Sequence, residues 1–316
     1  MNSIFACGEA LMDMVPTPTT AGCSFRPVPG GCPYNSAIAA ARAGGSVHFI
    51  GNISTDFFGD KLVEQLSSND VGLDHVTRSG RPTTLAFVDL QAGEARYAFY
   101  NNASANVNLR PPVAGSIGAS GDILLVGSIS LIKSPASDRI ADFAVKSANH
   151  MTLAIDPNVR SGMISDRRTW SARMERLFGV ASIVRLSDED LDFVRPGLSA
   201  EDFAADLLAG SAALVVVTRG KEGSEAFARN CRVKVRAPQI EVVDTVGAGD
   251  TLIGSLLAWL CGHDISTRKA LASIDRDALH SLMTFATHAA ALNCTRNGCN
   301  PPTREEILSF QAKVDS

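Results

Sequence analysis

The sequence has 316 residues, of which 45% are hydrophobic and 20% are charged, enough for one large α/β unit with a substantial core. The formal net charge of −4, without a long block of Lys or Arg, gives no electrostatic reason to expect nucleic acid or an anionic membrane as a partner. The longest apolar runs, residues 212–217 and 252–260, are too short to span a bilayer, and the first residues lack the basic and apolar regions of a signal peptide.

Seven cysteines are scattered along the chain, and no pair has CxxC spacing. The nearest pair, Cys294 and Cys299, has no neighbouring His or Cys that would complete a zinc site. Ordinary buried thiols in a reducing compartment fit this pattern, so the sequence predicts a cytoplasmic protein.

Short β-rich apolar runs alternate with longer amphipathic stretches. Strands are predicted at residues 4–7, 47–50, 123–126, 153–155, 182–186 and 214–218. Helices are predicted at residues 35–43, 57–67, 135–148, 201–208 and 277–292. Continuous apolar strands that alternate with helices favour a mostly parallel sheet covered on both faces.

Residues 82–108 interrupt this rhythm. Polar and apolar residues alternate on both sides of a glycine-containing turn at residues 91–94, which predicts a β-hairpin. Residues 12–29, rich in Pro and Thr, could add strands beside it, and together the two segments would form a small β lid over a cleft. The alternative is an edge hairpin of the main sheet. Without a low-complexity linker or an internal repeat, we expect a single domain over residues 1–316.

The run Asp244-Thr-Val-Gly-Ala-Gly-Asp250 carries the strongest chemical signal, because a helical apolar pattern follows it directly. Glycines 247 and 249 let the backbone bend so that successive N–H groups can point at one anion, and the helix dipole adds positive charge there. Taken alone, Asp250 could cap the helix or act as a base beside a bound phosphate. The Walker A and dinucleotide-binding glycine motifs are absent from the sequence.

This run resembles the second signature of the PfkB (ribokinase-like) carbohydrate kinase family. The run Gly30-Gly31-Cys-Pro-Tyr-Asn35-Ser-Ala-Ile-Ala-Ala-Ala-Arg-Ala-Gly44 resembles the first signature, and Gly51-Asn-Ile-Ser-Thr-Asp56-Phe-Phe-Gly59-Asp60 is also similar to the family. The resemblance extends from Gly8 to about Pro302. It implies an α/β, ribokinase-like three-layer αβα fold with a mostly parallel central sheet and a small β lid.

The family's roles imply a phosphotransferase site. Asp250 would be the catalytic base for the sugar hydroxyl, and the backbone amides of Gly247, Ala248 and Gly249 would form the anion hole. The resemblance places the sugar on a second group of residues, namely Asp13, Gly31, Asn35, Phe99, Asn101 and Arg160. Without the family, Asp13 would be a polar residue at a strand end, Asn35 a helix N-cap and Arg160 a partner in a surface salt bridge.

The ATP site implied by the resemblance contains Ser187, Thr218, Gly220, Gly223, Gly249 and Thr287. The family's Asn-x-x-Glu motif, which is linked to Mg²⁺ and phosphate, appears here as Ser187-Asp-Glu-Asp190, so Asp190 or Glu189 would assist Mg²⁺ indirectly. Asp244 matches a region where family members often bind a monovalent cation, although Pro302 stands where a hydroxyl residue would be expected. The expected cofactors are therefore ATP and Mg²⁺, with K⁺ left open.

Several runs, including Gly8-Glu-Ala-Leu-Met-Asp13 and Asp156-Pro-Asn-Val-Arg160, look like those of bacterial fructokinases, which favours fructose as the substrate. The competing activities are 2-keto-3-deoxygluconate kinase and ribokinase. In the acid-specific kinases an arginine commonly follows the aromatic pair of the lid, whereas Asn101 follows Phe99-Tyr100 here. A rival from another class is a catalytically inactive sugar-binding regulator. A homodimer through the lid is also left open.

Overall fold

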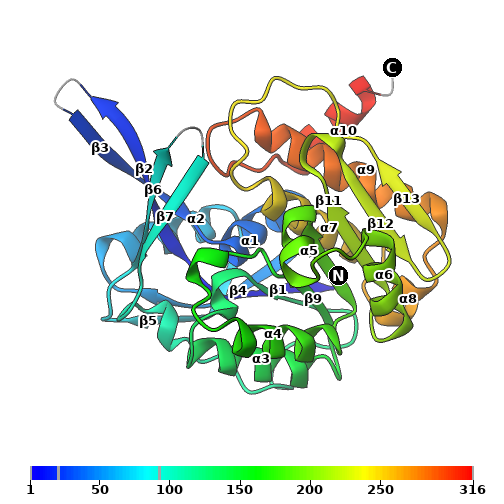
Figure 1. Ribbon diagram of the computed structural model, residues 1–316, viewed down its shortest axis with the longest axis horizontal. Helices are drawn as coiled ribbons and strands as arrows, with labels where there is room; N and C mark the ends of the chain where they lie inside the picture. The colour runs from blue at the N-terminus through cyan, green and yellow to red at the C-terminus, as the bar shows by residue number, and fades with distance from the viewer. Residues whose placement is uncertain (1, 20–21, 92–93, 315–316) are drawn as a thin grey trace.

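The structure is a computed structural model that describes residues 2–19, 22–91 and 94–314. Its main sheet contains β1 (Ser3–Cys7), β4 (Ser46–Ser54), β5 (Gly72–Ser79), β8 (Ile123–Gly127), β9 (Thr152–Asp156), β10 (Ile183–Ser187), β11 (Leu214–Thr218), β12 (Ser224–Ala228) and β13 (Arg232–Val235). The strand order is β13-β12-β11-β10-β9-β8-β1-β4-β5 (Figure 1). The strands from β11 to β5 pair in parallel, and β12 and β13 are antiparallel.

Both faces of this sheet are buried, as its continuous apolar strands predict. In β11, Leu214 and Val216 pack into one hydrophobic cluster, while Val215 and Val217 pack into the other. The first cluster lies under α1 (Cys32–Arg42), α2 (Phe57–Ser68), α7 (Ala248–Gly262), α8 (Arg268–Ala272), α9 (Arg276–Cys294) and α10 (Arg304–Val314). The second lies under α3 (Ala136–Ser147), α4 (Arg167–Phe178), α5 (Asp188–Val194) and α6 (Ala200–Ala209). The predicted three-layer αβα architecture is confirmed.

A second sheet forms the lid. It consists of β2 (Leu11–Thr19), β3 (Gly22–Gly30), β6 (Thr84–Gln91) and β7 (Glu94–Tyr100), in the order β3-β2-β6-β7. The predicted β lid is confirmed and the alternative of an edge hairpin in the main sheet is wrong, because β6 pairs with β2 instead (Figure 1). Residues 92 and 93 of the predicted turn lie outside the described residues, and part of the segment after β7 is a short 3-10 helix, η1 (Asn106–Asn108).

Some boundaries differ from the sequence-based expectation. Helix α1 begins at Cys32 rather than at residue 35, because Gly31 is its N-cap and proline is tolerated in a first turn. The interpretation of Asn35 as an N-cap is therefore wrong. Asp13 lies within β2 rather than at its end. The sequence pattern also failed to reveal β5, whose residues are largely half-buried or exposed and so lack a continuous apolar run.

The strand order places the candidate site. After β1 the chain first builds the sheet outward through β4 and β5, and it later returns to the other side of β1 through β8. In open parallel sheets, ligands bind beyond the carboxyl ends of the strands at such a switch point. No helix in the described part of the chain is both long and apolar enough to cross a membrane.

Candidate active site

A cavity of about 420 Å³ lies at this switch point, between the lid, the carboxyl ends of the main strands and the amino end of α7. It brings together residues that the sequence places far apart. The predicted site residues in its lining are Asp13, Gly31, Asn35, Phe99, Arg160, Ser187, Asp190, Gly247, Ala248, Gly249 and Asp250. Six others lie outside the lining, namely Asn101, Thr218, Gly220, Gly223, Asp244 and Thr287.

The glycine turn at the start of α7 has a conformation suited to binding an anion. Gly247 is the N-cap and has a φ of 75°, in the left-handed region that favours glycine. A Cβ at this position would also collide with the Cys299 side chain. The Ala248 N–H donates to the Thr245 carbonyl oxygen, whereas helix geometry leaves the Gly249 and Asp250 amides without intrahelical acceptors. These two amides are the strongest candidates for holding a negative charge.

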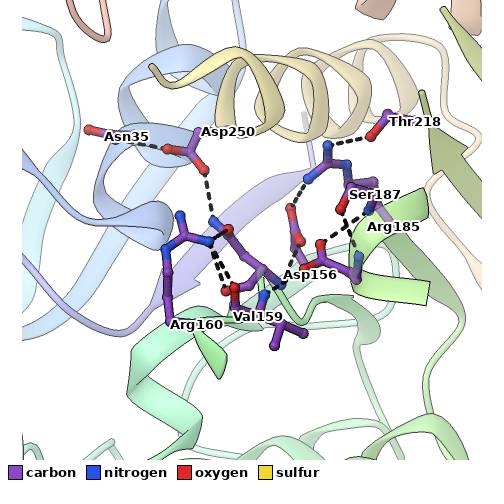
Figure 2. Close-up of polar contacts among 10 residues, drawn as sticks. Asn35, Asp156, Val159, Arg160, Arg185, Ser187, Thr218 and Asp250 are labelled. Atoms are coloured by element: carbon purple, nitrogen blue, oxygen red, sulfur yellow. Dashed lines mark hydrogen bonds and ion pairs between the residues drawn. The ribbon is translucent and has the colours of Figure 1, made fainter. Parts of the chain in front are cut away.

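Asp250 lies in the first turn of α7 and is only 7% exposed. Its Oδ2 accepts a hydrogen bond of 2.8 Å from Asn35 Nδ2 on α1, and its Oδ1 lies 3.5 Å from Asn158 Nδ2 (Figure 2). Burial raises the pKa of Asp250, and hydrogen bonds from Asn35 and Cys32 act in the opposite direction, as do the charges of Arg160 and Arg185. A carboxylate with this environment can accept a proton from a hydroxyl group in the cavity.

The sugar-side residues adjoin this carboxylate. Asp13 projects from the lid strand β2, and burial raises its pKa to about 6, with a further contribution from the charge of Asp250. Gly31 has a φ of 112°, and a Cβ there would lie 2.7 Å from the Glu9 carbonyl oxygen. Both requirements restrict residue 31 to glycine.

Glu9 is a lining residue that the sequence analysis did not select. It follows β1 and is 2% exposed, and burial raises its pKa to about 7. Its Oε1 accepts from the Cys32 N–H at 3.1 Å, and its Oε2 accepts from the Ser130 N–H at 3.2 Å and from the Ser130 hydroxyl. Glu9 therefore connects the first turn of α1 to the short 3-10 helix η2 (Ser128–Leu131) that follows β8. The sequence signal for Glu9 is a carboxylate two residues after the end of an apolar strand.

The loop after β9 carries Asn158 and Arg160. Asn158 has a φ of 37°, and its side-chain oxygen accepts from Arg160 Nη1 at 2.5 Å. Within the described residues Arg160 forms no ion pair, and its side chain lines the cavity. Its guanidinium is thus placed to meet an oxygen-rich ligand.

Ser187 and Asp190 form a capping box at the start of α5. The Asp190 Oδ2 accepts from the Ser187 N–H at 3.1 Å, while its Oδ1 accepts from the Val159 N–H at 2.8 Å. Both carboxylate oxygens therefore accept hydrogen bonds from backbone N–H groups. Asp190 would contact a nearby metal ion through water. The neighbouring Glu189 is exposed and lines the cavity.

The predicted nucleotide residues lie beyond this lining. The Thr218 hydroxyl accepts from Arg185 Nη2 at 2.7 Å, and the Thr287 hydroxyl lies 2.7 Å from the Ser224 hydroxyl. Gly220 and Gly223 have φ values of 49° and 99° in the turn that joins β11 to β12. A Cβ on Gly223 would collide with the Val235 carbonyl oxygen of β13, so packing of the sheet is one reason for this glycine.

Asp244 connects the glycine turn to a distant loop. Its Oδ1 accepts from the Val246 N–H at 3.0 Å, and its Oδ2 accepts from the Gly298 N–H at 2.8 Å. Asn293 continues this connection by donating to the Val246 carbonyl oxygen at 2.8 Å. In the part of the chain that the structure describes, no group of three or more His, Cys, Asp or Glu side chains could hold a metal ion.

Comparisons with known proteins agree with this geometry. The model of the pfkB family carbohydrate kinases matches residues 1–306. A fructokinase from Rhizobium leguminosarum bv. trifolii is 37% identical over 279 residues, which cover 88% of this chain and 86% of that protein.

Two solved fructokinases share the fold over nearly their whole lengths. The Xylella fastidiosa enzyme with bound ATP has a TM-score of 0.90 and 27% identity, covering 99% of each chain. The Vibrio cholerae O395 enzyme with fructose, ADP and calcium has a TM-score of 0.83 and 26% identity, covering 98% of this chain and 99% of that one. A double mutant of the Vibrio enzyme contains fructose, ADP and potassium, with a TM-score of 0.84, 26% identity and 98% coverage of both chains. This chain belongs to the pfkB family of carbohydrate kinases.

Proposed function

We propose that this chain is an ATP-dependent fructokinase that transfers the γ-phosphoryl group of ATP to D-fructose and produces fructose 6-phosphate. The observation that carries the proposal is the position of Asp250, a buried carboxylate beside the glycine turn at the amino end of α7. The relatives named as fructokinases, and the Vibrio cholerae structures with fructose and ADP, support the choice of sugar.

In the proposed reaction, Asp250 removes the proton of the attacking hydroxyl group while that oxygen forms a bond to the γ-phosphorus. The bond from phosphorus to the β–γ bridging oxygen breaks, and ADP leaves. The amides of Gly249 and Asp250, with the amino end of α7 behind them, stabilise the negative charge on the transferring group. Phosphoryl transfer depends mainly on such positioning and electrostatic stabilisation.

The sugar is proposed to occupy the space between the lid and Asp250. Asp13 and Asn35 offer hydrogen-bonding groups to sugar hydroxyls, Gly31 allows a close approach of the backbone, and Phe99 covers the site from β7. Asn101 lies beyond the end of β7 and outside the lining, so any effect on the sugar would depend on lid closure.

The nucleotide is proposed to extend from the glycine turn toward the β11–β12 turn, along Ser187, Thr218, Gly220 and Gly223, with the adenosine near Thr287. Mg²⁺, when bound with ATP, would neutralise phosphate charge. The oxygen donors present fit this hard cation. The exposed Glu189 carboxylate could bind water ligands of the ion at the cavity, while Asp190 accepts hydrogen bonds from the Val159 and Ser187 N–H groups. We propose a K⁺ site at the loop that Asp244 joins to Gly298, supported by the potassium-containing relative.

At the level of the whole molecule, we propose that residues 1–316 act as one kinase domain in the cytoplasm, without nucleic acid or a membrane as partner. None of the six cysteines whose side chains the structure describes forms a disulfide, which fits a reducing compartment. A homodimer through the lid is proposed because the lid strands expose Phe25 (42%) and Tyr100 (65%).

A sugar-acid kinase is the second candidate, because the Arg160 guanidinium in the cavity could pair with a carboxylate as readily as with a phosphate or hydroxyl group. The inactive-regulator alternative is disfavoured, because the sequence has both Asp250 and the glycine turn, and Asp250 lies in the first turn of α7. A coupled assay of ADP release should be run over fructose, ribose, tagatose, nucleosides and 2-keto-3-deoxygluconate. Fructose should give the highest kcat/KM. A preference for the acid would refute the choice of substrate, and no turnover on any sugar would refute the kinase proposal.

A further inference from the structure

Arg185 is a buried cation that the proposed reaction has not yet used. It lies on β10 and is 6% exposed, and it connects two other buried side chains. Its Nη1 donates to Asp156 Oδ2 at 2.9 Å, and its Nη2 donates to Thr218 Oγ1 at 2.7 Å (Figure 2). Asp156 ends β9 and Thr218 ends β11, so the guanidinium is fixed at the carboxyl edge of three adjacent strands.

The guanidinium lies directly against the first turn of α7. A Cβ built on Gly249 would be 2.8 Å from Arg185 Nη1 and 2.9 Å from Nη2, closer than real Cβ atoms approach other heavy atoms. The Arg185 side chain therefore occupies the space that any larger residue at position 249 would need. Among the described residues that line the cavity, the Arg and Lys side chains are Arg160 and Arg185.

The ion pair of Arg185 differs from that of Arg173, the other buried arginine among the side chains that the structure describes. In the pair of Arg173 on α4 with Asp138 on α3, the Arg173 side chain is 4% exposed but the Asp138 side chain is 57% exposed. In the pair of Arg185 with Asp156, the side chains are 7% and 0% exposed. A fully buried pair often stabilises a fold no better than apolar residues of similar volume, because both charges lose their hydration. Arg185 Nε also has no hydrogen-bond partner among the described residues.

We propose that Arg185 is a positioning residue for phosphoryl transfer, held by Asp156 and Thr218 so that its positive charge lies behind the anion hole formed by the first turn of α7. The inference rests on the proposed kinase reaction. The charge would favour the negatively charged transferring phosphoryl group, and the guanidinium would also fix Gly249. By fixing Gly249 and the neighbouring amides, Arg185 would act on the anion hole. This role explains why the guanidinium lies against the first turn of α7, which packing alone does not require.

The first test compares Arg185→Met with Arg173→Met, which removes a buried arginine whose side chain is not part of the cavity lining. Arg185→Met should lower kcat about 10² to 10³-fold, the range for loss of one preorganised anion-stabilising group. Arg173→Met should lower the Tm but leave kcat of the folded enzyme within about twofold. Arg185→Lys keeps the positive charge but cannot make the hydrogen bonds to Asp156 and Thr218 with a planar guanidinium. The kcat of this variant should lie between those of Arg185→Met and the wild type.

Arg185→Met alone leaves the buried Asp156 carboxylate without its cationic partner, with the Asn158 N–H as a remaining hydrogen-bond donor, and could fail to fold. The double variant Asp156→Asn with Arg185→Met removes both charges, and it should be folded while its kcat is still reduced at least about 10²-fold. A folded double variant with wild-type kcat would overturn the inference.

Nucleotide affinity provides a measurement that does not depend on turnover of fructose. Calorimetry with AMP-PNP and with AMP, in the presence of Mg²⁺, should show that the double variant binds AMP-PNP at least about tenfold more weakly but binds AMP normally. Equal losses for both nucleotides would mean that Arg185 is only structural. If the wild type phosphorylates no sugar, the proposed function fails, and this comparison still decides the role of Arg185.

The pH profile offers a second readout. The charged and titratable groups that interact with Asp250 come from several elements and are Asp13, Cys32, Asp156, Arg160, Arg185 and Cys299. The Arg185 charge lowers the pKa of Asp250, so its removal should raise that pKa further. The acid limb of kcat/KM should therefore move to higher pH in Arg185→Met and much less in Arg185→Lys. An unchanged acid limb in Arg185→Met would contradict the proposed position of the charge.

Discussion

Replacing Asp250 with Asn tests the centre of the proposed mechanism. The substitution keeps the size of the side chain, and the amide oxygen can still accept the hydrogen bond from Asn35 Nδ2 that the structure shows at 2.8 Å. The amide cannot accept a proton from the sugar hydroxyl. General-base catalysis contributes roughly 10² to 10⁴-fold, so we expect kcat to fall by this factor, equivalent to about 2.7 to 5.4 kcal/mol in the activation free energy.

The same substitution should not destabilise the fold. Asp250 is 7% exposed, and burial raises its pKa, so the ionised carboxylate loses favourable hydration on folding. A neutral amide loses less hydration on folding than an ionised carboxylate. We therefore expect the Tm of the variant to equal or exceed that of the wild type. The affinity for fructose should be retained, because Asn35 and Asp13 are unchanged.

The assay combines coupled ADP release with calorimetry of fructose binding and thermal unfolding. Asp275→Asn is a suitable control, because it makes the same change at the exposed N-cap of α9, where asparagine is also a good cap. A folded Asp250→Asn variant that binds fructose and retains more than about a tenth of the wild-type kcat would refute the assignment of Asp250 as base.

Three further predictions follow from the site. Because burial raises the pKa values of Asp250 and Asp13, kcat/KM should fall as the pH decreases through a midpoint well above the ordinary aspartate value of about 3.9, and a midpoint at that value would contradict the burial of the base. Gly223→Val should lower the Tm, because the new side chain collides with the Val235 carbonyl oxygen of β13, and it should raise KM for ATP more than KM for fructose, because Gly223 lies in the proposed nucleotide turn; equal effects on both KM values would indicate general damage to the fold instead. The kcat/KM for fructose should exceed that for 2-keto-3-deoxygluconate at least about tenfold. Asn101→Arg should reduce this ratio, because the arginine offers the carboxylate of the sugar acid an ion-pair partner. A larger ratio in that variant would count against a contact between the lid and the sugar.

The sequence alone was sufficient to predict much of the fold. Continuous apolar strands such as β11, with alternating residues facing two helical layers, predicted a sheet buried on both sides. The glycines of the turn at residues 244–250, followed by an apolar helical pattern, predicted a helix amino terminus able to bind an anion. These features are local, because backbone conformation and side-chain period depend on neighbouring residues. Strand β5 was missed since its half-exposed residues lack that period.

The assembly of the site was decided only by the tertiary structure. Asn35 and Asp250 are separated by 215 positions, and their hydrogen bond depends on how α1 packs against α7. Glu9 and Arg185 illustrate the same point, because nothing local shows that one would hold Cys32 and Ser130 or that the other would lie against Gly249. Side-chain periodicity identifies a strand and its buried faces, but it does not specify which strands become neighbours. The strand order brings the carboxyl ends of β1, β9, β10 and β11 to one edge of the sheet. Burial at this edge raises the pKa values of polar residues such as Glu9 and Asp156, an effect that their sequence neighbours do not predict.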